Sequence, residues 1–332
     1  MKALLCKELG GTDRLVVEDV AELIAGEREV IVRAHAAGVN FPDGLIIQGK
    51  YQFKPALPFS PGGECAGVIE SVGAGVKHLR PGQRVMVFTT SGAFAEQVRA
   101  PAAAAVMPMP DDLDFVTASA FVLAYGTSYH ALVDRAALTP GETVLVLGAA
   151  GGVGLAAIEI GKALGARVIA AASSVAKLEV CKRHGADEVI DYAAGDLRAQ
   201  LKALVPNGPD VVYDPVGGGY TEAAFRSIGW RGRHLVVGFA AGDIPALPAN
   251  LALLKGAALI GVFWGDYARR EPAKLFADVV QLLAWLRAGK VKPEISGVYP
   301  LERGAEAIQA LLDRKATGKL VITMAPTASS TS

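Results

Sequence analysis

A short apolar run followed directly by a glycine-rich turn constrains the fold of this chain more than any other feature. The run Thr143–Gly148 has the sequence TVLVLG, and the turn continues as AAGGVG to Gly154. An uninterrupted apolar run is typical of a strand that is covered on both faces, as in a parallel sheet. A helical pattern follows over residues 152–164. Strand, glycine turn and helix in this order predict a dinucleotide-binding site.

The glycines of this turn have separate expected roles. Gly151 lets the backbone approach a pyrophosphate closely, and Gly154 lets the helix and the strand pack tightly. Gly152 and Val153 lie in the first helical turn, whose N–H groups and positive partial charge attract phosphate. Ala149 stands where the usual first glycine would be. The prediction therefore rests on the strand–turn–helix context and not on a complete GxGxxG.

Strands and helices alternate on both sides of this turn. Further apolar runs are expected to form strands at residues 167–172, 188–192, 210–213, 234–239 and 258–264, with helical patterns between them. Together with 143–148 this makes six strands. Alternation of this kind predicts βαβ units, and six strands match the doubly wound parallel sheet of a Rossmann domain, within the α/β class.

The first third of the chain has a different pattern. Short β-type runs at 29–34, 64–72 and 83–88 are separated by Gly and Pro turns, which is typical of a partly open β-barrel. A last strand at 319–323 looks like a return to that domain. We expect a Rossmann domain over residues 121–265, inserted between two pieces of a barrel domain, 1–120 and 266–326, with a disordered tail over 327–332.

The end of the second strand indicates which dinucleotide is bound. An NAD site normally has Asp or Glu there to accept hydrogen bonds from the ribose hydroxyls. No acid lies between Glu159 and Glu179 in this chain. Ser173 and Ser174 can donate hydrogen bonds to a 2′-phosphate, and Lys177 can supply positive charge. A charged hydrogen bond contributes roughly 1.5–3 kcal/mol, so we expect NADPH to be preferred over NADH.

Composition excludes several classes of partner. Lys and Arg together number 33, as do Asp and Glu, so the net charge is zero. Nucleic acid and anionic membrane surfaces favour a basic face, and both are unlikely partners here. Three widely spaced cysteines fit no zinc ribbon or disulfide framework. No signal peptide or membrane span is expected, and we predict a cytoplasmic protein with reduced thiols.

Six motifs resemble one family. They lie at residues 38–43 (GVNFPD), 61–67 (PGGECAG), 73–76 with 81–85 (GAGV and PGQRV), 148–154, 185–187 (GAD) and 213–218 (YDPVGG). To about residue 324 the chain resembles the zinc-independent, zeta-crystallin-like NADPH:quinone oxidoreductases of the medium-chain dehydrogenase/reductase superfamily. The resemblance implies a GroES-like barrel as the catalytic domain, and NADPH in the cleft between the domains.

The same resemblance implies a set of cofactor contacts. They are Asn40, Thr127, Gly151, Gly152, Val153, Ser173, Lys177 and Tyr192, with Tyr192 near the adenine, then Val237, Gly238, Phe239, Val262, Phe263 and Trp264 as the nicotinamide-side wall, and Lys319 as a phosphate contact.

The comparison with alcohol dehydrogenases argues against a metal. Those enzymes place a catalytic cysteine where this chain has Asn40, and a histidine where it has Gly63 before Glu64. Neither substitute is a good zinc ligand. The cysteine-rich structural lobe is also missing. Without zinc there is no Lewis acid to stabilise an alkoxide, so we expect hydride transfer to an acceptor that is already electrophilic.

Three residues are expected near the reacting atoms. Asn40 is expected to hydrogen-bond the acceptor oxygen or the nicotinamide ribose, Tyr51 to donate a proton or hydrogen bond, and Asp43 to orient a neighbour. Each has a structural alternative. Asn40 caps a turn, Asp43 is a helix N-terminal residue, and Tyr51 is a surface aromatic on a loop. In a quinone oxidoreductase of the resembled family, a tyrosine follows two residues after the aspartate, and this chain has Leu45 there. This difference argues against a fixed proton relay.

The acceptor is left open by the sequence. A quinone is the first expectation, and an enoyl- or acryloyl-thioester or an alkenal is the alternative with the same hydride geometry. A crystallin-like NADPH-binding or RNA-binding protein with little catalysis is an alternative of another class. The apolar run 258–264 would lie at a sheet edge. Because exposed edges invite pairing, we predict a homodimer through it.

Overall fold

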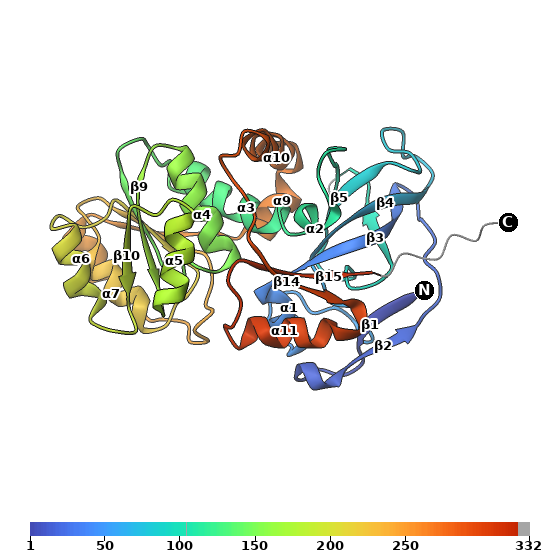
Figure 1. The fold of residues 1–332 in the computed structure, drawn as a ribbon, viewed down its shortest axis with the longest axis horizontal. Coiled ribbons are helices and arrows are strands. Elements are labelled where there is room, and N and C mark those ends of the chain that lie inside the picture. The colour runs from blue at the N-terminus through green and yellow to red at the C-terminus, as the bar shows by residue number, and fades with distance from the viewer. Residues whose placement is uncertain (104, 325–332) are drawn as a thin grey trace. The chain divides into compact units, whose positions relative to one another are not determined.

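The structure is a computed structural model that describes residues 1–103 and 105–324, and the chain divides into two compact units. Unit 1 comprises residues 1–123 and the segment from Ile295 onward, and unit 2 comprises residues 124–294. Figure 1 shows the elements of both in chain order. No helix among the described residues is long and apolar enough to cross a membrane.

Unit 1 is built around one long strand. Its strands are β1 (Lys2–Cys6), β2 (Leu15–Asp19), β3 (Glu29–Val39), β4 (Glu64–Val72), β5 (Arg84–Phe88), β6 (Gln97–Pro101), β7 (Val106–Pro108), β14 (Ile295–Pro300) and β15 (Lys319–Thr323). The main sheet has the order β14-β15-β3-β4-β5-β7, and β6 also pairs with β3. In the β15–β3 ladder Leu320 lies opposite Val39. The C-terminal strand therefore returns beside the end of β3.

Short helices complete unit 1. They are α1 (Phe41–Ile47), α2 (Phe115–Ser119) and α11 (Gly304–Leu312), with 3-10 turns at Thr12–Arg14 and Leu301–Arg303; α3 (Val122–Tyr129) continues into unit 2. Alternate residues of β3 and β5, among them Val30, Val32, Val85 and Val87, enter one apolar core. Each fully buried aliphatic side chain contributes roughly 1.5–3 kcal/mol to stability. This core holds the ends of β3, β4 and β15 in place.

Unit 2 has a six-stranded parallel sheet with the order β10-β9-β8-β11-β12-β13. The strands are β8 (Thr143–Val146), β9 (Arg167–Ala172), β10 (Glu188–Asp191), β11 (Val211–Asp214), β12 (Arg233–Val236) and β13 (Ala258–Gly261). The order reverses between β8 and β11, which is the point where such sheets bind ligands. The predicted Rossmann sheet is confirmed. Its last strand ends at Gly261, three residues earlier than the expected 264.

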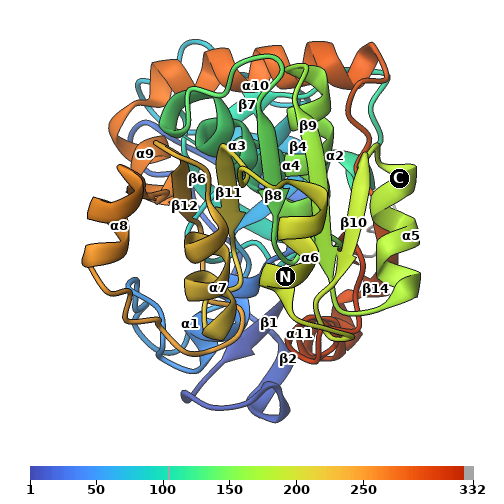
Figure 2. The same ribbon diagram turned by 90° about the vertical axis from the view of Figure 1, so that its left-hand side faces the viewer.

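Helices lie on both faces of this sheet. Those that contact its strands are α4 (Gly152–Ala163), α5 (Val175–Arg183), α6 (Leu197–Leu204) and α7 (Gly219–Ser227). Unit 2 also contains α8 (Asn250–Lys255), α9 (Trp264–Arg270), α10 (Pro272–Arg287) and a π-helical turn at His130–Arg135. Figure 2 looks onto the face that α6 and α7 cover, and α4 lies on the opposite face in both views. This is the arrangement that right-handed crossovers produce on either side of a switch point.

The second domain boundary was predicted too early. We expected the return to the barrel domain at residue 266, but the division falls at Glu294. Helices α9 and α10 belong to unit 2 because their side chains pack there. The Tyr267 ring stacks on His130 with centroids 3.9 Å apart, and its hydroxyl donates to Asp278 at 2.6 Å. The tail predicted over 327–332 lies outside the described residues.

Candidate functional site

The glycine turn of unit 2 has the geometry of a phosphate cradle. Gly148 has a left-handed φ of +55°, and Gly151 caps α4 in an extended conformation. A Cβ on Gly154 would lie 2.6 Å from the carbonyl oxygens of Gly148 and Ala149. Glycine at 154 therefore lets the helix pack against the turn itself, where we had expected packing against the strand. The first-turn amides have no intrahelical acceptors and suit a phosphate.

Gly151 differs from Gly154 in what surrounds it. The nearest atom to a Cβ on Gly151 would be the Gly148 carbonyl oxygen at 3.5 Å, which is an ordinary contact. Its φ of −79° is also open to any residue. The protein's own packing therefore does not require glycine at 151. The space is available to a group that approaches the backbone from outside the protein, as the sequence analysis expected.

The residues expected at the 2′-phosphate surround the start of α5. Ser173 is exposed, Lys177 is half-buried, and Ser174 is the N-cap. The Ser174 hydroxyl oxygen accepts a hydrogen bond from the Lys177 amide at 3.4 Å. This capping role uses the oxygen as an acceptor and leaves the O–H available to donate. The three residues therefore lie within the loop after β9 and the first turn of α5.

Sequence reasoning missed a carboxylate in the neighbouring strand. Asp191 ends β10 and lies opposite Ala172 in the ladder with β9. Its Oδ1 accepts hydrogen bonds from the amides of Ala193 and Ala194 at 2.9 and 3.2 Å, so it is held by its own loop. An acid was expected only at the end of the second strand, where this chain has none. Parallel pairing places this later acid at the same sheet edge.

Tyr192 follows directly and lies beside the same edge. Its backbone amide donates to the Ala172 carbonyl oxygen at 3.2 Å. Its ring packs against the Tyr220 ring at a tilt of 45°, with centroids 4.5 Å apart. The expected position near an adenine fits this placement at the carboxyl ends of β9 and β10.

The loop after β11 is held by a buried carboxylate to which the sequence analysis gave no role. Asp214 accepts hydrogen bonds from the Val216 and Gly217 amides, both at 2.9 Å, and from the Thr221 hydroxyl at 2.6 Å. His234 lies 3.1 Å away on β12. Burial alone would raise the Asp214 pKa, but the bonds from His234, Thr221 and Gly217 lower it. The buried aspartate in the YDPVGG motif was the signal for this role.

The residues expected around the nicotinamide also lie at strand ends. Residues 237–239 follow β12 and residues 262–264 follow β13, so both triplets lie at the carboxyl edge of the sheet. Phe263 is 53% exposed, whereas Trp264 is buried. A Cβ on Gly126 would come within 2.8 Å of the Trp264 ring. Thr127, the next residue of α3, is buried.

Unit 1 contains a second, buried polar cluster at the end of β3. It comprises Asn40, Asp43, Glu64 and Lys319, all 6% exposed or less. The Lys319 ammonium donates to the Val39 carbonyl oxygen at 3.0 Å, to Glu64 Oε1 at 2.8 Å and to Asn40 Oδ1. Since an ammonium has three hydrogens, its donor capacity is fully used. This geometry does not favour the phosphate contact predicted for Lys319.

The Asn40 side chain is fixed by its partners. Its Nδ2 donates to the Gly38 carbonyl oxygen at 3.2 Å and to Glu64 Oε1 at 3.0 Å. Both amide hydrogens are therefore engaged, which argues against the expected donation to an acceptor oxygen. Asn40 is also the N-cap of α1, and its backbone amide donates to Asp43 Oδ2 at 2.7 Å. The capping alternative of the sequence analysis is thus present in the structure.

Asp43 and Tyr51 have shifted pKa values. Burial raises the pKa of Asp43 to about 7, although hydrogen bonds from the Asn40 and Gly62 amides and the Lys319 charge oppose the rise. Burial, with the Asp43 charge as a second cause, raises the pKa of Tyr51. Asp43 lies at the N3 position of α1 and accepts from the Asn40 backbone amide, which is the helix N-terminal alternative; its role near the reacting atoms stays a prediction. Tyr51 is half-buried against the core of unit 1 and remains protonated at neutral pH.

Within residues 1–103 and 105–324, no group of three or more His, Cys, Asp or Glu side chains is arranged to hold a metal.

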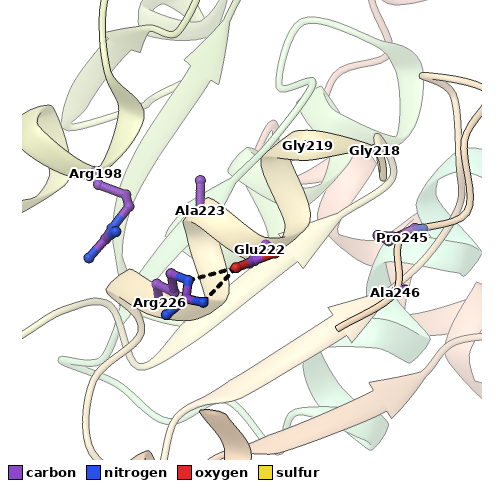
Figure 3. A pocket seen from close by; sticks show the side chains of 8 residues that line it. All are labelled: Arg198, Gly218, Gly219, Glu222, Ala223, Arg226, Pro245 and Ala246. Carbon is purple, nitrogen blue, oxygen red and sulfur yellow. Dashed lines mark hydrogen bonds and ion pairs between the residues drawn. The ribbon is translucent and has the colours of Figure 1, made fainter. Parts of the chain in front are cut away.

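A shallow hollow on unit 2 lies between α6, α7 and residues 245–246 (Figure 3). Arg226 there pairs with Glu222 at 2.7 Å. None of the predicted site residues lines this hollow.

The chain is similar to known proteins over nearly its whole length. Two family models match the chain: Alcohol dehydrogenase GroES-like domain over residues 26–111, and Zinc-binding dehydrogenase over residues 152–285. The first match confirms the GroES-like character of unit 1. The quinone oxidoreductase-like protein 2 homolog of Nematostella vectensis is 40% identical over 97% of this chain and 88% of its own length.

Solved structures are similar to this chain over nearly its whole length. Escherichia coli quinone oxidoreductase, solved in complex with NADPH, is 28% identical with a TM-score of 0.91, covering 97% of this chain and 100% of its own. A structure described as an NAD-dependent alcohol dehydrogenase is 30% identical with a TM-score of 0.88, covering 98% and 100%. Similar folds therefore serve proteins described with either dinucleotide.

Proposed function

Since the chain belongs to the quinone oxidoreductase-like family of the medium-chain dehydrogenases/reductases, we propose that it is an NADPH-dependent oxidoreductase that reduces a quinone or a similarly activated acceptor without zinc. NADPH supplies the hydride. With one proton from solvent or from a side chain, the quinone becomes a hydroquinone and NADPH becomes NADP⁺.

One observation carries the cofactor assignment. Ser173, Ser174 and Lys177 lie just after β9, where an NAD site normally has a carboxylate. The glycine turn fits a dinucleotide, because Gly154 closes the turn and Gly151 leaves the backbone open to approach. The NADPH complex of the related Escherichia coli enzyme supports the same choice. Asp191 is the feature that opposes it, and the neighbouring amides hold its carboxylate.

Reaction without zinc is supported by the charge at the end of β3. The Lys319 ammonium contacts Asn40, the first position that differs from alcohol dehydrogenases, and Glu64, which directly follows the second, Gly63. While this ion pair is intact, the ammonium already engages the Asn40 oxygen and Glu64 Oε1, the atoms that a metal would need. Asn40, with its side chain tied on three sides, is a weak zinc ligand in any case. Tyr51 stays protonated and is suited to donate a hydrogen bond to the acceptor.

The experiment that tests this proposal is steady-state NADPH oxidation with a panel of quinones, alkenals and enoyl thioesters. We expect the highest kcat/KM with a quinone, and we expect elemental analysis to find less than stoichiometric zinc. Turnover only with enoyl thioesters or alkenals would replace the quinone assignment. One zinc per chain would contradict the metal-free reaction. Tight NADPH binding with no oxidation would favour the binding-protein alternative.

We also propose a homodimer through β13. This strand is the last in the sheet order, so one side of it has no strand partner in the described chain. Large apolar side chains are exposed on it and on nearby segments of unit 2: Trp230, Leu253, Leu254, Leu259 and Phe263. Pairing two such edges covers both. Light scattering at micromolar concentration should give twice the 34.4 kDa chain mass. A monomeric mass would contradict the dimer.

The cytoplasmic location stays a prediction. The three cysteines are buried and form no disulfide, which is consistent with a reducing compartment.

A further inference from the structure

We propose that His184 is a proton-operated clasp. As an imidazolium it bridges Glu159 of α4 to Glu294 and so fastens residues 290–294 to unit 2, and it releases Glu294 when the ring loses its Nε2 proton. We call residues 290–294 the return segment, because they are the last of unit 2 before the chain enters unit 1. All groups of the clasp lie within unit 2, and the proposal depends neither on the cofactor nor on the acceptor.

The His184 ring lies between two carboxylates. Its Nδ1 is 2.7 Å from Glu159 Oε1, and its Nε2 is 3.4 Å from Glu294 Oε2. An ionised carboxylate can only accept hydrogen bonds, whereas a neutral imidazole has one donor nitrogen and one acceptor nitrogen. Only the imidazolium therefore satisfies both contacts at once. The His184 side chain is 7% exposed, so little of the ring is open to water as a substitute partner.

Glu159 is the fixed side of the clasp. Its buried carboxylate accepts hydrogen bonds from the Tyr125 hydroxyl at 2.6 Å and from the Lys292 backbone amide at 2.9 Å, both through Oε2. Burial, with the Glu159 charge as a second cause, raises the pKa of Tyr125 well above its usual value. The Tyr125 hydroxyl therefore stays a donor, and of these three partners of Glu159, His184 is the one that titrates near neutral pH.

Glu294 is the movable side of the clasp. Its side chain is 35% exposed, and Arg183 of α5 approaches its Oε1 to 3.8 Å. A neutral His184 ring keeps its hydrogen on Nδ1, where the contact with buried Glu159 is shorter, and so turns the Nε2 lone pair toward Glu294. Acceptor then faces acceptor, and the Glu294 carboxylate turns to water. The return segment loses this tether and keeps the one through the Lys292 amide.

The direction of the pH dependence follows from the same contacts. The hydrogen bond to Glu159 is the largest cause that raises the His184 pKa above its usual value of 6.5; burial opposes the rise, and the Glu159 charge and Glu294 add to it. Because the folded pKa is raised, the tether is complete below pH 6.5 and is lost as pH rises through the folded value. The clasp is therefore closed in mildly acidic solution and opens on the alkaline side.

Hydrogen–deuterium exchange of the full chain tests the clasp. Peptides that contain residues 291–296 are followed at pH 6 and pH 8.5, and each rate is divided by the intrinsic rate at that pH to give a protection factor. The variants are His184→Gln and Glu294→Gln. Glutamine at 294 can accept from one ring tautomer and donate to the other, so it keeps the contact at both pH values. Glu179→Gln, which changes an exposed acid of α5, controls for the loss of one negative charge.

We expect protection of the wild-type return segment to fall about two- to fivefold from pH 6 to pH 8.5, the coupling of a partly exposed charged pair. The same fall should occur in Glu179→Gln, whereas His184→Gln and Glu294→Gln should show none. Peptides from the buried strand β8 serve as the internal reference. An equal fall in Glu294→Gln would overturn the proposal, as would unchanged protection in the wild type or an equal fall in β8.

Discussion

The glycine turn of unit 2 is built from backbone groups, whereas the cluster of Asn40, Asp43, Glu64 and Lys319 in unit 1 is built from side chains. The turn uses backbone amides of consecutive residues, and it requires glycine at 148, where φ is left-handed, and at 154, where a Cβ would meet two carbonyl oxygens. The cluster uses four side chains, two from strands β4 and β15, one from α1 and one from the N-cap of α1, and one buried ion pair holds it together. Adding side-chain volume should therefore disturb the turn most, whereas removing a charge or changing the pH should alter the stability of the cluster most.

The largest expected effect is a loss of stability when a substitution removes one charge from the cluster. Lys319→Met leaves Glu64 buried without its cation, which typically costs about 3–5 kcal/mol. The double variant Glu64→Gln/Lys319→Met should recover much of this loss, because no unpaired charge remains. Urea unfolding at pH 7 measures both free energies. If the single and double variants lose the same stability, the ion pair is not what holds the cluster together.

The next effect is a pH dependence that originates in unit 1. The folded pKa of Asp43 is about 7, above its usual value of 3.8, so the folded state binds this proton more tightly than the unfolded state. The contribution to stability is complete below pH 4 and is lost as pH rises toward 7. Its slope is at most about 1.4 kcal/mol per pH unit. Asp43→Asn should remove this slope.

Urea unfolding at a series of pH values compares the wild type with Asp43→Asn. The difference between their unfolding free energies should move in favour of the variant as pH rises from 4 to 7. Parallel curves over this interval would show that Asp43 does not titrate in the way its burial indicates.

For unit 2, the expected effect is on ligand binding at the start of α5. Lys177→Ala should raise the Kd of NADPH by about ten- to a hundredfold, because a charged hydrogen bond contributes roughly 1.5–3 kcal/mol, and should leave the Kd of NADH unchanged. Calorimetry with both dinucleotides measures this. An equal loss for NADPH and NADH would place Lys177 away from the 2′-phosphate.

The two regions also differ in how far the sequence predicts them. The turn was predicted because Thr143–Gly154 is one continuous segment whose apolar strand, glycines and helix signal lie together. The cluster was not, because Lys319 meets Asn40 only through the register of β15 on β3. Each of these two residues was predicted to contact the cofactor separately, and the contact between them was not foreseen.

The same reason explains the misplaced domain boundary. The amphipathic pattern of α10 predicted a helix, but amphipathicity does not say which sheet or helix covers the apolar face. Stacking of Tyr267 on His130 settles that question for unit 2, and no local signal indicates it. Asp214 and Asp191 were likewise visible as residues, but their roles depend on which strands are neighbours.

The smallest expected effect separates the two functions of the glycine turn itself. Gly154→Ala places a Cβ 2.6 Å from two carbonyl oxygens, so the turn must shift, and overpacking of this kind costs about 1–3 kcal/mol of stability. Gly151→Ala meets its nearest atom at 3.5 Å and should leave the unfolding free energy within about 0.5 kcal/mol of the wild type. Both variants should bind NADPH more weakly, the first because the amides move and the second because the methyl group blocks the approach of a phosphate. Urea unfolding and calorimetry on the same preparations give the two numbers for each variant. If Gly151→Ala binds NADPH like the wild type, the open backbone at 151 serves no ligand, and the turn is a packing feature like any other tight turn.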